Sequence, residues 1–265
     1  MTMHSFAANG AAGRTADEAW ARTWQPRPDA RLRLICFPPA GAGAMFFRPW
    51  AQRLPAEIEV VSVLLPGREN RIAEPLITDY RQAVSALHTA LRPLTAQPYA
   101  LFGHSMGALL AYGFALETAR YGGPAPVRLF VSGAAGPGTE TRKNRTAWTD
   151  DEIVAELRTM GGTPEAVFAE PELLALMLPI FRADFAVCDA FRAAPPAADP
   201  VLECPVTILG GAADEYSAQQ LASWADVTRG PSRQRMFPGG HFFLSEESAE
   251  AVPLSVGADL ADATR

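Results

Sequence analysis

Ser105 lies at the centre of the pentapeptide Gly-His-Ser-Met-Gly. A short apolar run, Tyr99 to Phe102, precedes it and predicts a strand, and a helical pattern follows from Ala108 to Ala119. Gly-x-Ser-x-Gly between a strand and a helix is the pattern of a nucleophile elbow, a strained turn that exposes the serine hydroxyl. Side chains at Gly103 and Gly107 would collide with neighbouring backbone. The alternative is a glycine-rich turn whose serine only caps the helix.

A serine hydroxyl needs a base that removes its proton, and an imidazole has a suitable pKa. Among the four histidines, only His241 follows both the serine and an acid in the required chain order of serine, acid, histidine. It lies in the loop Phe237–Phe243, after the last predicted strand. His104 adjoins Ser105 and is expected to point away from that hydroxyl. A histidine on a surface loop is the alternative for His241.

The acid that orients this imidazole should follow a late strand. Asp214 comes directly after the apolar run Pro205 to Leu209 and is the first candidate, and Glu215 is the second. The oxyanion of an acyl-transfer reaction needs two backbone N–H donors. We expect one from Met106, the residue after the nucleophile, and the other from Ala40, in the loop of small residues after the first strand.

Strands and helices alternate along most of the chain, which predicts a mostly parallel sheet flanked by helices. The predicted strands are Arg31–Phe37, Ile58–Leu65, Tyr99–Phe102, Val127–Ser132, Pro205–Leu209 and Arg233–Phe237. Helical spacing joins Phe46 to Leu54 and continues in Asp79–Leu94, Ala108–Ala119 and a closing helix, Phe243–Ala261.

The stretch 138–200 has helical segments and no strand pattern. We interpret it as a helical lid inserted over the carboxyl edge of the sheet, within a core formed by residues 29–137 and 201–265. Residues 1–28 are expected to be a flexible tail. Two acidic lid residues, Asp184 and Asp189, are expected to pair with Arg182 or Arg192 or to line the entrance.

Composition excludes several classes of protein. The chain of 265 residues has a net charge of −6, which argues against nucleic acid or an anionic membrane surface as a partner. No apolar run is long enough to cross a bilayer, and the N-terminus does not resemble a signal peptide. Three cysteines without ligand spacing predict no metal site and a reducing, cytoplasmic location. No motif predicts a cofactor.

The chain resembles the stand-alone (type II) thioesterases that accompany polyketide synthases and non-ribosomal peptide synthetases. The resemblance extends from Trp24 to Leu260. The loop Pro-Gly-Arg-Glu-Asn-Arg and the lid motif Leu-Pro-Ile-Phe-Arg-Ala-Asp-Phe are its most specific parts, because they are not general features of this fold. Five segments carry it: residues 36–41, 65–71, 102–107, 178–185 and 239–243.

This resemblance implies an α/β-hydrolase fold and the hydrolysis of acyl thioesters on the phosphopantetheine arm of carrier proteins, which clears aberrant or stalled chains. It maps a catalytic triad onto Ser105, Asp214 and His241, with an acyl-enzyme intermediate and no cofactor beyond the substrate's own phosphopantetheine. The implied partners are acyl or peptidyl carrier domains. A serine esterase of small free esters and an inactive hydrolase-fold binding protein are the alternatives.

Two further groups of side chains are candidates for substrate and partner contacts. Apolar residues that are expected to wall the acyl pocket are Phe46, Leu173, Leu176, Met177, Phe181 and Phe185. A basic cluster near the start of the lid is expected either to meet the carrier or to be a solvated charge run: Arg142, Lys143 and Arg145. The acyl-chain length, the partner synthase and the oligomeric state stay open at this point.

Overall fold

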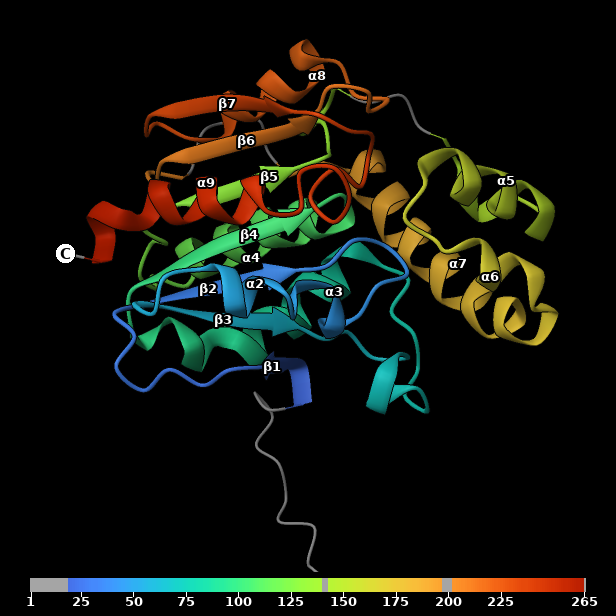
Figure 1. Cartoon of the computed structure of the whole chain (residues 1–265), viewed down its shortest axis with the longest axis horizontal. Helices are drawn as coiled ribbons and strands as arrows, with labels where there is room; N and C mark the ends of the chain where they lie inside the picture. The colour runs from blue at the N-terminus through green and yellow to red at the C-terminus, as the bar shows by residue number, and fades with distance from the viewer. Residues whose placement is uncertain (1–18, 140–142, 197–201, 265) are drawn as a thin grey trace, which may run out of the picture.

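The structure, a computed structural model, describes residues 19–139, 143–196 and 202–264. It contains one seven-stranded sheet of order β1-β3-β2-β4-β5-β6-β7 (Figure 1). Strand β1 pairs antiparallel with β3, and the other neighbouring strands are parallel. The strands are β1 (Ala21–Thr23), β2 (Leu32–Phe37), β3 (Ile58–Val63), β4 (Tyr99–His104), β5 (Leu129–Ser132), β6 (Val206–Gly211) and β7 (Ser232–Phe237).

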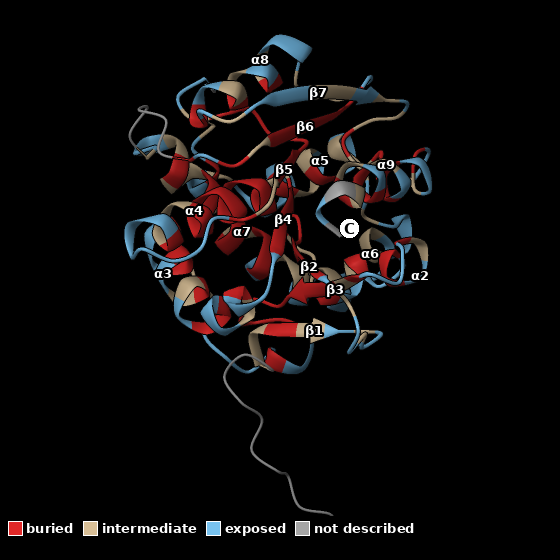
Figure 2. Cartoon of the chain, turned by 90° about the vertical axis from the view of Figure 1, so that its left-hand side faces the viewer, coloured by how far each residue is buried: buried red, intermediate tan, exposed pale blue. Residues whose placement is uncertain are grey.

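Both faces of the sheet are covered, so most side chains of its central strands are apolar and buried. Successive side chains of a strand point to opposite faces. Leu34 and Cys36 of β2 therefore pack in one buried cluster, while Ile35 and Phe37 pack in the other. Figure 2 shows β4 near the centre of the molecule and β6 above it, beneath the edge strand β7, and both are buried.

Helices α3 and α4 pack against one face of the sheet, and α2 and α9 against the other (Figure 1). Asp79 caps the N-terminus of α3 by accepting a hydrogen bond from the Gln82 N–H at 2.8 Å. The α-helices of the core are α2 (Trp50–Arg53), α3 (Tyr80–Leu91), α4 (Met106–Arg120), α8 (Ala218–Ala222) and α9 (Ala251–Leu260). Short 3₁₀ helices are η1 (Ala44–Phe47), η2 (Glu69–Arg71), η3 (Arg92–Ala96), η4 (Arg145–Ala147), η5 (Ser223–Val227) and η6 (Ala261–Thr264).

Three helices follow β5 and lie together beyond one end of the sheet, on the right of Figure 1. They are α5 (Asp150–Met160), α6 (Glu165–Ala169) and α7 (Pro171–Ala193). Residues 143–196 contain helices and no strand, as the sequence predicted. The C-terminal half of α7 packs into the core, where Phe191 meets Tyr80 at a ring distance of 5.0 Å. The lid is therefore anchored at one end.

Two predictions about the ends of the chain were wrong. Ala21–Thr23, within the expected tail, forms an edge strand on β3, while residues 1–18 lie outside the described residues. The three-residue strand is too short to show alternation, and a contact at 4.2 Å between the Arg71 guanidinium and the ring of Trp20 anchors its start.

The closing helix begins at Ala251, and residues 241–250 form turns. Pro253 lies in the first turn of this helix, where a proline is tolerated because an N–H there has no acceptor within the helix. No helix of the described residues is long and apolar enough to cross a membrane.

Candidate active site

Ser105 joins β4 to α4 with φ 54° and ψ −121°, a backbone conformation that non-glycine residues rarely adopt. A Cβ added to Gly103 would lie 2.1 Å from the Gly107 carbonyl oxygen. One added to Gly107 would lie 2.0 Å from the Phe37 carbonyl oxygen. Neither position has room for a side chain, so the prediction of a tight, strained elbow is confirmed.

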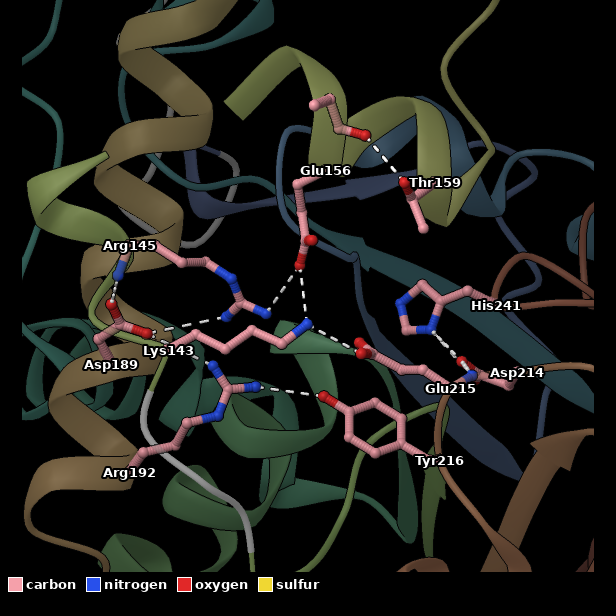
Figure 3. A network of polar contacts seen from close by, with 11 residues as sticks. Lys143, Arg145, Glu156, Thr159, Asp189, Arg192, Asp214, Glu215, Tyr216 and His241 are labelled. Atoms are coloured by element: carbon pink, nitrogen blue, oxygen red, sulfur yellow. Dashed lines mark hydrogen bonds and ion pairs between the residues drawn. The ribbon is translucent and has the colours of Figure 1, made fainter. Parts of the chain in front are cut away.

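The imidazole of His241 meets the carboxylate of Asp214. Nδ1 lies 3.1 Å from Oδ1 and 3.1 Å from Oδ2 (Figure 3). The side chain of Asp214 is fully buried, and that of His241 is 5% exposed. Glu215, the second candidate for the acid, turns away and pairs with Lys143 at 2.8 Å. The structure therefore places Asp214, and not Glu215, where a carboxylate orients the ring.

Backbone contacts between the loops after β6 and β7 set this geometry. The Ala212 N–H donates to the Phe237 carbonyl at 2.8 Å, and the Ala213 N–H donates to the Gly239 carbonyl at 2.9 Å. A Cβ on Gly211 would lie 2.2 Å from the Gly240 carbonyl oxygen. The two loops thus pack backbone to backbone, which fixes the acid against the base.

Ser105 and His241 line one small cavity of about 10 Å³. Nε2 of His241 is buried and has no hydrogen-bond partner among the described residues. Such an atom calls for an explanation, and a role in proton transfer supplies one. Ala40 and Met106 line the same cavity. Met106 is the first residue of α4, so its N–H has no acceptor within the helix.

His104 does not contact Ser105. Its Nδ1 lies 2.9 Å from the Ser132 hydroxyl, and the side chain is fully buried among aromatic rings that include Phe46. Burial, together with the positive charge that His241 can carry, lowers the pKa of His104 well below its ordinary value. His104 is therefore neutral at pH 7.

A second cavity of about 150 Å³ opens beside Ser105 and is mostly apolar. Four of the six residues expected to wall the acyl pocket line it: Phe46, Met177, Phe181 and Phe185. The expectation was wrong for Leu173 and Leu176, whose side chains are exposed. Other residues that line the cavity were not predicted from the sequence, among them Leu157 and Met160 of α5 and Phe242. Phe242 directly follows the candidate base, and this position could have indicated that it lies at the site. The contact of α5 depends on the tertiary packing of the helices in residues 143–196.

Lys143 and Arg145, which were expected either to meet the carrier or to be a solvated charge run, both form ion pairs within the chain. Lys143 bridges Glu156 of α5 at 2.9 Å and Glu215 at 2.8 Å (Figure 3). The side chain of Arg145 is 3% exposed and pairs with Glu156 and Asp189. A buried, paired guanidinium cannot meet a carrier, so the expectation for Arg145 was wrong. Arg142 lies outside the described residues.

These ion pairs connect the lid with the loop that carries the acid. Burial alone would raise the pKa of the Glu156 carboxyl, but its hydrogen bond with Lys143 and the nearby positive charges outweigh this and lower the pKa. Asp189 pairs with Arg192 at 3.5 Å, as predicted. Arg192 also donates to the Tyr216 hydroxyl at 3.2 Å, beside the Asp214 loop.

The expectation for Asp184 was wrong. It neither pairs with Arg182 or Arg192 nor lines the entrance, but lies buried against Arg68. Arg182 pairs with Asp150 instead.

The described residues contain no group of three or more histidine, cysteine or acidic side chains that could hold a metal ion.

A family model described as Thioesterase domain matches residues 32–258. The chain belongs to the thioesterase family. The gramicidin S biosynthesis protein GrsT of Aneurinibacillus migulanus is 40% identical over 225 residues, which cover 84% of this thioesterase and 87% of GrsT. The human medium-chain S-acyl fatty acid synthase thioesterase is 36% identical over 249 residues, 90% of this chain and 91% of that protein.

Solved structures agree with this assignment and with the α/β-hydrolase fold. RedJ, a thioesterase from the prodiginine biosynthetic pathway in Streptomyces coelicolor, is similar with a TM-score of 0.82 and 36% identity, covering 89% of this chain and 92% of RedJ. The type II thioesterase BorB from the borrelidin biosynthetic cluster is similar with a TM-score of 0.81 and 36% identity, covering 93% and 98%.

Proposed function

We propose that this thioesterase hydrolyses acyl groups from the phosphopantetheine arm of carrier proteins in a polyketide or non-ribosomal peptide pathway, and so removes aberrant or stalled chains. The relatives named for such pathways support this role. One observation carries the chemistry: the hydrogen-bonded pair of His241 and Asp214 shares a cavity with Ser105 at the elbow.

In the proposed first step, the Ser105 hydroxyl attacks the thioester carbonyl carbon while Nε2 of His241 accepts its proton. The tetrahedral oxyanion accepts hydrogen bonds from the N–H groups of Ala40 and Met106. The carbon–sulfur bond then breaks, and His241 returns the proton to the pantetheine sulfur. The products are the free thiol of the carrier and an acyl ester on Ser105.

In the second step, water attacks the acyl ester and gives its proton to His241. The same two N–H groups hold the second oxyanion. Collapse of this intermediate releases the carboxylic acid and returns the proton to Ser105. Asp214 stays ionised throughout and stabilises the imidazolium that forms in each step.

Helices of the lid form part of the wall of the cavity that would hold the acyl group. The 150 Å³ cavity beside Ser105 is lined by apolar side chains from α5, α7 and the loops of the core. A cavity of about this volume holds a benzene-sized group. Short acyl chains therefore fit without movement of the lid, and longer ones require it to open.

Turnover of one acyl group in two chemical settings tests the proposal. A propionyl group is presented on a phosphopantetheinylated carrier protein and as the p-nitrophenyl ester, and kcat/KM is measured for both. We expect the carrier thioester to be preferred, with turnover lost in Ser105→Ala. Preference for the free ester would favour a general esterase, and absence of turnover on both would favour a binding protein.

A further inference from the structure

Two segments that lie far apart in the sequence meet at one buried ion pair. Arg68 belongs to the Pro-Gly-Arg-Glu loop, and Asp184 belongs to the lid motif on α7, 116 residues later. Nη1 of Arg68 donates to Oδ2 of Asp184 at 2.7 Å, and Nη2 donates to Oδ1 at 2.8 Å. Arg68 is 4% exposed and Asp184 is 1% exposed. The pair is thus bidentate and buried.

Both members of the pair also hold the loop that carries the proposed oxyanion donor. Oδ2 of Asp184 accepts a hydrogen bond from the Gly41 N–H at 2.8 Å. Nη1 of Arg68 donates to the Ala42 carbonyl at 3.1 Å. These contacts hold the backbone of Gly41 and Ala42, which directly follow Ala40. The orientation of the Pro39–Ala40 peptide, whose N–H is the proposed donor, therefore depends on them.

Gly41 makes this loop dependent on outside support. Its φ of 76° lies in the left-handed region, and a Cβ there would lie 2.0 Å from the ring of Phe181. The glycine is therefore required, and a glycine has more backbone freedom than any other residue. Contacts from the Arg68–Asp184 pair and from the Phe181 ring restrict that freedom.

The pair is poorly explained as a device for stability alone. Burying two charges costs solvation free energy, and apolar residues of similar volume often give equal or greater stability than a buried ion pair. An apolar pair, however, offers the Gly41 N–H and the Ala42 carbonyl no partner. The ion pair differs from an apolar pair because it forms hydrogen bonds with the backbone of the loop at Gly41 and Ala42.

The geometry points to Arg68 and Asp184 as positioning residues that orient the Ala40 N–H in the oxyanion hole. Because Asp184 belongs to α7, they also couple the position of this lid helix to the geometry of the hole. This role rests on the function proposed above. Loss of one oxyanion donor typically costs 10²–10³-fold in kcat, and a misdirected donor should cost about tenfold or more.

The double variant Arg68→Met/Asp184→Leu tests this role, because the apolar pair preserves volume without a buried charge. We expect kcat to fall about tenfold or more, with KM nearly unchanged and the midpoint of the kcat/KM pH profile unmoved, since His241 and Asp214 are intact. Asp184→Ala, which removes the acceptor of the Gly41 N–H, should lower kcat in the same way. Arg182→Met/Asp150→Leu removes the ion pair between Arg182 of α7 and Asp150 of α5, which does not contact the loop. This variant should retain kcat.

Thermal denaturation separates positioning from stability. The account predicts that kcat falls in the double variant even where its melting temperature equals that of the wild type. A double variant that folds and keeps its kcat would overturn the proposal. If the double variant does not fold, Asp184→Ala decides: unchanged kcat there, with the acceptor of the Gly41 N–H removed, contradicts the positioning role just as directly.

An acyl trifluoromethyl ketone separates this proposal from the proposed function. It forms a hemiketal oxyanion on Ser105 and requires only the nucleophile and the oxyanion donors. Its affinity, followed by ¹⁹F NMR, should fall in the double variant and in Asp184→Ala but not in Arg182→Met/Asp150→Leu. A wild type that binds the ketone without hydrolysing carrier thioesters would refute the proposed function alone. Equal binding by wild type and the folded variants would refute the positioning role alone.

Discussion

The imidazole rings of His104 and His241 lie 5.1 Å apart between their centroids. His104, the residue before Ser105, thus packs beside His241, the proposed base. Two protonated imidazoles at this distance would repel one another, so a neutral His104 favours the cation that forms on His241 during the reaction. A neutral, buried histidine also makes folding dependent on pH.

Stability should fall as the pH decreases below about 6.5. Because the pKa of His104 lies well below its ordinary value in the folded state, the unfolded chain binds more protons in that window, and protonation favours unfolding. The contribution is at most about 1.4 kcal/mol per pH unit. Denaturant unfolding at several pH values should show this slope in the wild type and a smaller one in His104→Asn.

Ser132→Ala serves as the control for that comparison. It removes the hydroxyl that contacts Nδ1 of His104 but keeps the titrating imidazole, so the pH slope should remain. Wild-type and His104→Asn stabilities that decline in parallel below pH 6.5 would contradict the assignment.

Asp214→Asn should lower kcat on the order of 10⁴-fold, as in other triads in which an amide replaces the carboxylate. The amide cannot stabilise the imidazolium or hold the required tautomer. Glu215→Gln is the matched control on the adjacent residue, because it loses only the partly exposed ion pair with Lys143. Steady-state kinetics on one acyl thioester decide between them, and a greater loss in Glu215→Gln would reassign the acid.

Lys143→Gln should loosen the lid without impairing recognition of the carrier. It removes the bridge between Glu156 of α5 and Glu215 of the acid loop, and partly exposed ion pairs contribute about 0–1 kcal/mol each. We expect faster amide hydrogen exchange in α5 and equal changes in kcat/KM for carrier-bound and small soluble thioesters. An effect confined to the carrier-bound substrate would restore the docking role.

Met177→Ala should shift the preferred acyl chain toward longer groups. Met177 lines the 150 Å³ cavity, and its truncation leaves room for two or three methylenes, each worth about 0.8 kcal/mol when buried. Leu173→Ala on the same helix is the control, since this side chain is exposed and does not line the cavity. An unchanged length preference over a series of acyl thioesters would show that the cavity holds a different part of the substrate.

Local patterns were sufficient to predict six of the seven strands, all but β1, and the residues of the candidate triad. The elbow is a local motif, and chain order selected His241. The later start of α9 was not predicted, because the apolar pattern extends from Phe243 although residues 241–250 form turns.

The ionic contacts of the lid were not predictable in the same way. Asp184 was expected to pair locally, yet its partner, Arg68, lies 116 residues away. Arg145 was interpreted as a surface charge, although carboxylates of α5 and α7 hold it in the interior. A charged side chain is solvated unless the fold brings it a partner, and only the three-dimensional structure shows which partners meet.

Trapping the acyl-enzyme tests the central claim most directly. Wild type is mixed with a propionyl-loaded carrier protein, quenched in acid at short times, and digested for peptide mass spectrometry. The account predicts a propionyl ester on Ser105 that forms and decays as the free carrier thiol appears, and no such adduct in Ser105→Ala. Thioester hydrolysis that continues in Ser105→Ala, or an adduct on another residue, would contradict it.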